Sequence, residues 1–549
     1  MDSHHETAGS IQIGSLPHDV ANDPLTSLLA AHGRGVEAGT SAHEPSVAPV
    51  LAGSREGLTQ LARLLARATD TALSARRLSG PLPPGSPGEV MRNAALALGP
   101  AELPRDGIGA EAALERVTRL LIEYGLDLTH PRAVAHLQPA PLAVAVVADT
   151  LASLSNASLD TYDSGPSGIA VERWLIATLA RMAKLGACAG GVMTPGGSMS
   201  NLLALLLARD AAALRRGVDA RRSGVSAMSK PVVFCSELSH FSVHRACAAL
   251  GLGEDAVRPV PTDDRRCMRV DALAALLSSL DASHTPIAIV ATAGTTDFGS
   301  VDPLHAIAEL ARAHRVWLHV DAAYGFGALF SERLAEKLTG LERADSITLD
   351  LHKLGWQPAA TSVLLVADTA TFTALEREVA YLNPNDDAEA GLDGLLGRSL
   401  QTTRRPDALK VAATFLSEGQ RGLGDMVDTC HALARHAEER IAAEPELELI
   451  APAELTTVVF RYRCRHWLGD RDHFENQVNG ALRRRLLERG HALIGRTEVT
   501  PTRAQARPLV CLKFTLLNPT TKPDELDELV QTVLRAGREA ERHLGDHLA

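Results

Sequence analysis

The sequence has few aromatic residues (3%), no closely spaced cysteine pairs and no long apolar run. Its seven cysteines are scattered and never form CxxC, so their spacing predicts neither a metal site nor a disulfide framework. No apolar stretch reaches the roughly 18 residues that a membrane-spanning helix needs. The first residues are polar, unlike a secretion signal. We therefore expect a cytoplasmic protein without a membrane partner.

An excess of basic charge is also lacking, because the formal net charge is -11 at pH 7. Nucleic-acid binding needs Lys and Arg gathered on one face, so the composition argues against a nucleic-acid partner. The 45% of hydrophobic residues is ordinary for a globular protein, and 549 residues allow one large domain with smaller ones. Small molecules are the expected partners.

Four segments are predicted along the chain. Residues 1–55 are rich in small and polar residues without periodicity, which indicates a flexible arm. Residues 56–165 carry helical patterns, and residues 406–549 mix helical and strand patterns as a small α+β domain does. Residues 166–405 alternate helices with short β-branched runs, which predicts a mainly parallel sheet covered on both faces. The expected strands of this large domain are 231–235, 287–292, 316–321, 346–351 and 362–367.

Two of these strands lead into chemically interesting side chains, Asp321 and Lys353. Ligands bind at the carboxyl ends of the strands in open α/β sheets, so we expect both side chains to face one crevice. Either residue alone is more often a member of a structural ion pair. The combination favours a reactive site.

Two further elements fit such a site. The sequence TPGGSMSN at 194–201 opens a helical run, where backbone N–H groups of Gly197 and Ser198 would attract a phosphate; a simple capped helix start explains the same residues. His240 follows a predicted strand and is placed to stack on a planar ring. A lone histidine in this position is more often a surface or core residue.

Together these motifs resemble the pyridoxal-dependent group II amino-acid decarboxylases, a family that includes glutamate, aromatic amino-acid, histidine and 2,4-diaminobutyrate decarboxylases. The resemblance runs from about residue 130 to 410. It implies an α/β fold of the aspartate-aminotransferase type (fold type I) and a pyridoxal 5'-phosphate cofactor. It also implies a homodimer with active sites at the subunit interface.

The resemblance also implies roles for single residues. Lys353 matches the lysine that carries the cofactor, and Asp321 the carboxylate that keeps the pyridine nitrogen protonated. The other cofactor-binding positions are Gly197, Ser198, His240, Thr296, Ala323, Asp350 and His352, with His240 also a catalytic candidate. Arg404 matches an arginine proposed to bind the substrate α-carboxylate, and His136 and Gln138 fall at substrate-pocket positions.

Residues 350–353, 381–384 and 402–410 look most like the bacterial branch that acts on 2,4-diaminobutyrate or, in siderophore-type enzymes, on lysine. We therefore expect decarboxylation of a basic diamino acid (2,4-diaminobutyrate, lysine or ornithine) to an amine and carbon dioxide. The alternatives are an aromatic or acidic substrate, an oxidative deamination that yields an aldehyde, and a different lyase or transferase reaction on the same fold. A non-catalytic scaffold is disfavoured because all of the matched residues are present.

The source of the proton for the α-carbon stays open. Relatives that act on aromatic amino acids or histidine carry a loop tyrosine before the arginine pair, but no tyrosine lies between Asn383 and Arg405 here, and the nearest is Tyr381. The remaining candidates are His240, His352, a water molecule or a residue of a second subunit.

Overall fold

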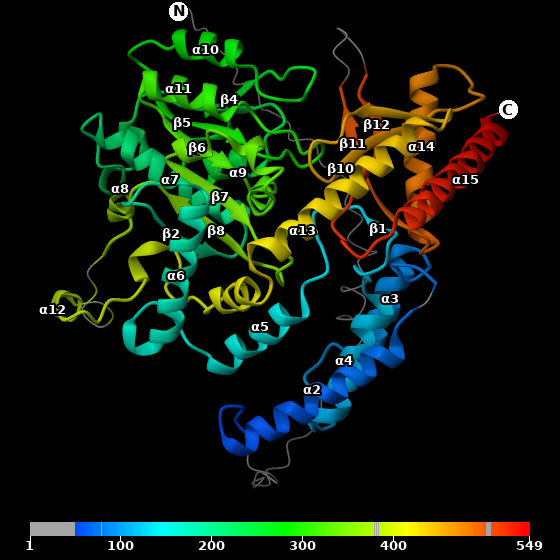
Figure 1. Cartoon of the computed structure of the whole chain (residues 1–549), viewed down its shortest axis with the longest axis horizontal. Coiled ribbons are helices and arrows are strands. Elements are labelled where there is room, and N and C mark those ends of the chain that lie inside the picture. The colour runs from blue at the N-terminus through cyan, green and yellow to red at the C-terminus, as the bar shows by residue number, and fades with distance from the viewer. Residues whose placement is uncertain are drawn as a thin grey trace, which may run out of the picture. The chain divides into compact units, whose positions relative to one another are not determined.

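The computed structural model describes residues 50–548, apart from 78, 378, 380, 381, 383 and 501–506 (Figure 1). The predicted flexible arm thus lies almost wholly outside the described residues, as do Tyr381 and Asn383. The chain divides into two compact units. The first comprises residues up to 78 with 83–125, and the second comprises 79–82 with 126–549. The four-segment division stays a prediction.

Three amphipathic helices form the described part of the first unit: α2 (Arg55–Ala75), α3 (Pro87–Leu98) and α4 (Ala110–Tyr124). The N–H of Gly57 donates to the side chain of Ser54 over 2.9 Å at the start of α2, and Ser86 with Glu89 forms a capping box at the start of α3. These contacts satisfy amide groups that have no partner within the helix. Several large apolar side chains stay exposed on this unit, among them Leu58, Leu65, Leu73, Met91, Leu96, Val117 and Leu121.

A seven-stranded sheet forms the centre of the second unit, in the order β2-β8-β7-β6-β5-β3-β4. The strands are β2 (Gly190–Thr194), β3 (Pro231–Ser236), β4 (Val257–Val260), β5 (Thr285–Thr292), β6 (Trp317–Asp321), β7 (Ser346–Asp350) and β8 (Ser362–Val366). All neighbours pair in parallel except β8, which is antiparallel to both β2 and β7. The mainly parallel α/β fold is confirmed, and all five strands expected for the large domain are present.

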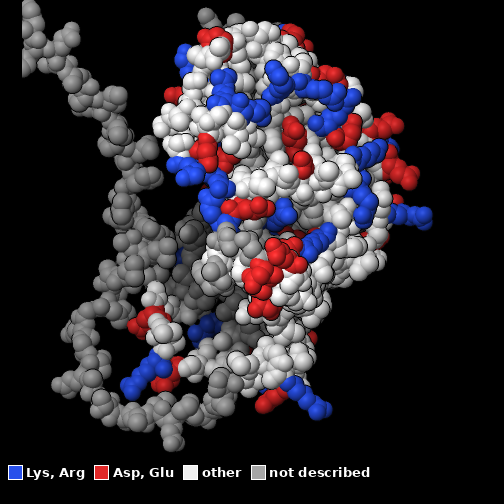
Figure 2. Space-filling model, turned by 90° about the vertical axis from the view of Figure 1, so that its left-hand side faces the viewer, with Lys and Arg blue, Asp and Glu red and all other residues white. Residues whose placement is uncertain are grey.

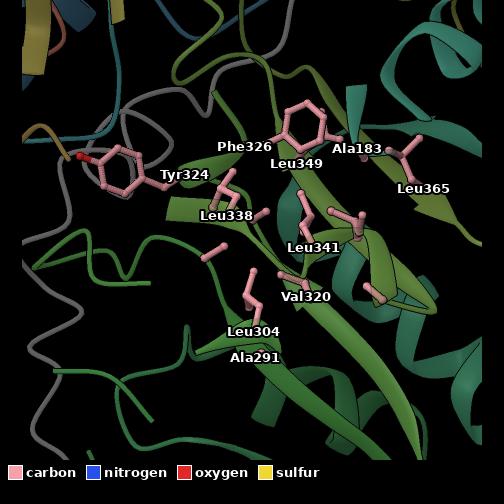
Figure 3. Packing of buried hydrophobic residues seen from close by; sticks show 14 of the residues in the cluster. Ala183, Ala291, Leu304, Val320, Tyr324, Phe326, Leu338, Leu341, Leu349 and Leu365 are labelled. Carbon is pink, nitrogen blue, oxygen red and sulfur yellow. The ribbon is translucent and has the colours of Figure 1, made fainter. Parts of the chain in front are cut away.

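Helices cover both faces of this sheet. Those that pack in its two cores are α6 (Pro166–Met182), α7 (Gly197–Leu214), α9 (Ser242–Ala249), α10 (Val270–Ser278) and α11 (Leu304–His314). The same unit also contains α5 (Ala143–Ser155), α8 (Ala220–Ser223) and α12 (Asn385–Glu389). Successive strand residues alternate between two cores: Leu365 packs in the core with α6, α10 and α11, and Leu364 in the core with α7 and α9. Figure 3 shows part of the first core, including Val320, Leu349 and Leu365. Burial on both faces explains why these strands read as continuous apolar runs.

The C-terminal part carries a second sheet in the order β1-β11-β12-β10-β9. Its strands are β1 (Ala133–Val134), β9 (Leu447–Ala451), β10 (Thr457–Tyr462), β11 (Leu493–Val499) and β12 (Leu509–Thr515), and its helices are α13 (Ala408–Ala442), α14 (Arg471–Glu488) and α15 (Pro523–Leu548). β1 lies just before His136 and Gln138 in the sequence and pairs in parallel with β11. α13 is one long run, interrupted by non-helical φ and ψ angles at Gly419.

Acidic and basic side chains are interspersed over the face of the molecule in Figure 2. Among the described helices, none is both long and apolar enough to cross a membrane.

Candidate active site

A cavity of about 490 Å³ opens at the carboxyl ends of the large sheet. Turns after five strands supply its walls: β2, β3, β5, β6 and β7. The nine cofactor-binding residues predicted from the sequence all line it: Gly197, Ser198, His240, Thr296, Asp321, Ala323, Asp350, His352 and Lys353. The fold therefore brings together residues that span more than 150 positions of the chain.

Asp321 ends β6 as a buried carboxylate in the cavity wall, with 6% of the residue exposed. Its Oδ2 accepts a hydrogen bond from Asn201 Nδ2 over 2.8 Å, and its Oδ1 accepts one from the N–H of Ala323 over 3.1 Å. Two donors hold the carboxylate in place, as a buried charge requires. It presents a fixed negative charge to the cavity.

Lys353 follows β7, the neighbouring strand, by three positions. Its Nζ lies 3.0 Å from Oδ2 of Asp350, and the hydroxyl of Ser362 donates to Oδ1 of the same carboxylate. About a fifth of the Lys353 side chain (19%) is exposed. The amine is thus reachable from the cavity and held by an acidic partner.

The turn between β2 and α7 contains two backbone N–H groups that are free to donate to a ligand. The N–H groups of Met199 and Ser200 donate to the carbonyl of Gly196, whereas those of Gly197 and Ser198 have no acceptor within the described part of the chain. A Cβ on Gly197 would come 2.9 Å from Oδ1 of Asp350, so a larger residue would not fit without a shift there. Free amides at the N-terminus of a long helix favour an anion such as a phosphate.

His240 lines the cavity on the side of β3 and is half-buried. Burial lowers the pKa of its imidazole, and the charge of Lys353 lowers it further, while the carboxylate of Asp321 opposes the change. Its Nδ1 lies 2.8 Å from the hydroxyl of Ser242. The ring is therefore favoured in its neutral form at pH 7.

The cavity thus combines a reachable amine, a buried carboxylate, an imidazole and two free amides. This donor set fits pyridoxal 5'-phosphate, which needs an amine for its aldehyde, an anionic partner for its ring nitrogen and N–H donors for its phosphate. The fit comes from residues of one chain.

Three predicted substrate-binding residues do not reach this cavity. Arg404 is buried with 6% of the residue exposed, and its Nη1 donates to both carboxylate oxygens of Glu172 over 2.9 and 3.0 Å. His136 and Gln138 are exposed, just after the short strand β1. The guanidinium of Arg404 thus has a structural partner in the core, and its substrate-binding role stays a prediction that this geometry does not support. The geometry also gives no support to a pocket role for His136 or Gln138 within this chain.

The sequence prediction also missed residues that the fold places at the site. Asn201, within the TPGGSMSN motif, holds Asp321 and lines the cavity. Lys513, on β12, lies with its Nζ 2.7 Å from Oδ1 of Asp297 and 3.4 Å from the carbonyl oxygen of the cavity residue Thr296. A lone lysine within the apolar run of β12 was the available signal.

Comparisons with known proteins agree with this site. The model of the family described as "Pyridoxal-dependent decarboxylase conserved domain" matches residues 93–463. An L-2,4-diaminobutyrate decarboxylase of Rhizobium meliloti is 41% identical over 443 residues, 80% of this chain and 85% of the relative. A cysteine sulfinic acid decarboxylase of Rattus norvegicus is 32% identical, covering 80% of this chain and 88% of the relative.

A solved structure gives the same picture. It is the glutamate decarboxylase domain of a diaminobutyrate-pyruvate transaminase and L-2,4-diaminobutyrate decarboxylase from Vibrio parahaemolyticus. The TM-score is 0.75 at 30% identity, with 88% of this chain and 97% of that chain covered.

The buried position of Arg404 predicts a stability effect. Arg404→Leu would leave the Glu172 carboxylate buried without its cation, which typically costs about 3 to 5 kcal/mol of the free energy of unfolding. We expect that loss in urea denaturation, with little change in the KM for substrate of the protein that remains folded. Arg405→Leu is the matched control, because Arg405 is 35% exposed at its side chain and Lys410 remains beside both of its carboxylate partners. A large rise in KM without loss of stability would restore the substrate-binding role of Arg404.

Proposed function

The chain belongs to the pyridoxal-dependent decarboxylase family, and we propose that its substrate is L-2,4-diaminobutyrate, which it converts to the corresponding diamine and carbon dioxide. It is a pyridoxal-phosphate-dependent carboxy-lyase that acts on an amino acid. The observation that carries the choice of substrate is the 41% identity to a diaminobutyrate decarboxylase over most of both chains.

The roles of the cavity residues follow from their chemistry. We assign Lys353 as the amine that binds the cofactor covalently, and the free N–H groups of Gly197 and Ser198 as donors to its phosphate. Asp321 holds a proton on the pyridine nitrogen, since a buried carboxylate favours a cation beside it. When bound, pyridoxal phosphate supplies an electron-accepting ring for the electron pair left behind as carbon dioxide departs.

Two more residues are assigned to position the ring. His240 and Ala323 both line the cavity, and we assign them to the two faces of the cofactor ring. His352 stands between Asp350 and Lys353 in the sequence, with its Nε2 3.7 Å from Oδ2 of Asp350. It helps to hold that carboxylate where Lys353 meets it.

Asp297 is our candidate for the distal ammonium of a diamino acid. It follows the cavity residue Thr296, and its side chain is 37% exposed. Its Oδ1 meets Lys513 and its Oδ2 accepts from the hydroxyl of Thr497 over 2.6 Å, which leaves acceptor positions free because a carboxylate has about four. Asp297 and Lys513 thus offer one charge of each sign next to the cavity wall.

The substrate is tested by incubating the purified protein, loaded with pyridoxal phosphate, with a panel of amino acids. We expect carbon dioxide and a stoichiometric amine from 2,4-diaminobutyrate, identified by mass spectrometry, and less from lysine or ornithine. Lys353→Ala is the control and should give no product, because it removes the amine that binds the cofactor covalently.

The panel also decides between the alternatives. Preference for cysteine sulfinate or glutamate would replace the diamino substrate with an acidic one, as the 32% identical relative suggests. An aldehyde in place of the amine would establish the oxidative reaction. A transformed amino acid without release of carbon dioxide would contradict decarboxylation.

The role of Asp297 is tested by its neutral isostere. Asp297→Asn should lower kcat/KM for 2,4-diaminobutyrate about tenfold or more relative to 2-aminobutyrate, because only the first substrate has a distal ammonium to pair. The ratio of the two kcat/KM values is the measurement. Equal losses for both substrates would assign Asp297 a purely structural role.

We also propose that the chain acts as a homodimer in the cytoplasm. Exposed apolar residues on α5 support this assembly, since a row of such side chains favours a covered face: Val146, Val147 and Leu151. The exposed apolar residues of α2, α3 and α4 give the same indication within their own unit. The cysteines are all unpaired, as expected in a reducing compartment.

Light scattering of the purified protein at micromolar concentration should give twice the mass of 58.2 kDa. Val147→Glu on α5 should shift that mass toward the monomer, because a charge would be buried at the interface. Leu214→Glu is the matched control, because Leu214 is similarly exposed but lies at the end of α7 and not on α5. A fully active monomer of the unmodified chain would contradict the assembly.

A further inference from the structure

Asn201 joins three polar side chains in the interior beside the cavity. It is the fifth residue of α7 and is 1% exposed. Its Nδ2 donates to Oδ2 of Asp321 over 2.8 Å and to the hydroxyl oxygen of Ser242 over 2.9 Å. Its Oδ1 lies 3.0 Å from Nε2 of His319. All the hydrogen-bonding positions on its amide nitrogen, and one on its oxygen, are thus in use.

The carboxylate of Asp321 fixes the direction of these bonds. An ionised carboxylate can only accept, so the amide nitrogen of Asn201 must face it and the amide oxygen must face His319. That oxygen can only accept, so His319 carries its proton on Nε2. His319 is fully buried, and burial lowers the pKa of its ring to about 4, which keeps it neutral with a single ring proton.

The other nitrogen of His319 is consistent with this assignment. Its Nδ1 lies 2.8 Å from the hydroxyl of Ser346, whose oxygen accepts from Trp317 Nε1 over 2.8 Å. The hydroxyl hydrogen of Ser346 is therefore free to point at Nδ1. The donors of His319, Ser346 and Trp317 therefore each have an acceptor.

The second branch leads to His240. Because Ser242 accepts from Asn201, its own hydroxyl hydrogen is free to donate to Nδ1 of His240, 2.8 Å away. The backbone N–H of Ser242 points at the same nitrogen over 3.3 Å. Two donors at Nδ1 leave no room for a proton there, so a neutral His240 carries its proton on Nε2.

We infer that Asn201 is a positioning residue that couples the two cofactor-facing groups: it orients the carboxylate of Asp321 and fixes His240 as the Nε2–H tautomer. This inference rests on the proposed roles of Asp321 and His240. His240 then offers a hydrogen-bond donor from Nε2, which has no partner among the residues that the structure describes. In this form the ring cannot serve as a base at Nε2, and it is a poor proton source for the α-carbon because it would become an anion.

Asn201→Asp tests the coupling by reversing the bonds at one position. The new carboxylate can only accept, so it would repel Asp321 and take the hydroxyl hydrogen of Ser242 away from His240. We expect the dissociation constant of pyridoxal phosphate, titrated into the apoprotein and followed by fluorescence, to rise about tenfold or more. We also expect the ring nitrogens of His240 to leave the chemical shifts of a single tautomer in spectra of protein labelled with ¹⁵N-histidine.

The signals of His240 are assigned by their loss in His240→Gln. Asn479→Asp is the matched control, because Asn479 is also fully buried and also makes three hydrogen bonds, to the backbone of Tyr462 and Glu475, but does not line the cavity. It should lose stability without either change. If either readout of Asn201→Asp stayed at the value of the unmodified protein, the coupling would be refuted.

A second variant covers the case in which Asn201→Asp does not fold. Ser242→Ala removes the hydroxyl donor at Nδ1 of His240 and leaves the bond from Asn201 to Asp321 in place. The ring nitrogens of His240 should shift, with the cofactor dissociation constant changed less than about threefold. Unchanged ring nitrogens would overturn the inference. None of these readouts uses an amino acid, so a failure of the proposed diaminobutyrate activity would leave them unaffected.

Discussion

The hydrogen bond from Asn201 to Asp321 joins the N-terminal end of α7 to the carboxyl end of β6. A carboxylate taken out of water must be partnered, and this bond supplies one of its partners from a different element. The same end of α7 carries the free N–H groups of Gly197 and Ser198. One contact therefore sets both where the negative charge lies and where an anion is attracted, and the cavity is the space between them.

The role of a charged side chain in this protein depends on whether it is buried in the core or lies at the cavity wall. Arg404 and Glu172 pair in the core, and Lys410 lies almost fully buried beside Asp149 and Asp407. Lys353 and Asp350 form a similar pair, but at the cavity wall, where the amine remains reachable. Residue type alone does not separate these cases, because burial and access decide whether a charge is a structural partner or a reactive group.

Much of the large domain was predictable because its strands are buried on both faces. Their apolar, β-branched runs identify β3, β5, β6, β7 and β8 within one or two residues. β2 and β4 were missed, since β2 begins with two glycines and β4 has only four residues. The antiparallel direction of β8 has no local signature, as an apolar run reads alike in either direction. The role of β1 in the C-terminal sheet depends on a pairing with β11 some 360 positions away.

The sequence by itself determined which residues meet at the cavity: a lysine, an aspartate, a histidine and a glycine turn each follow a strand, and the carboxyl ends of parallel strands meet at one edge. Only the tertiary structure decided what lies behind that site. Arg404 is turned into the core by Glu172, and Asn201 is brought to Asp321 across 120 positions. Such contacts depend on how α6 and α7 pack on the sheet. Local sequence patterns do not predict which side chains of two packed elements point toward each other.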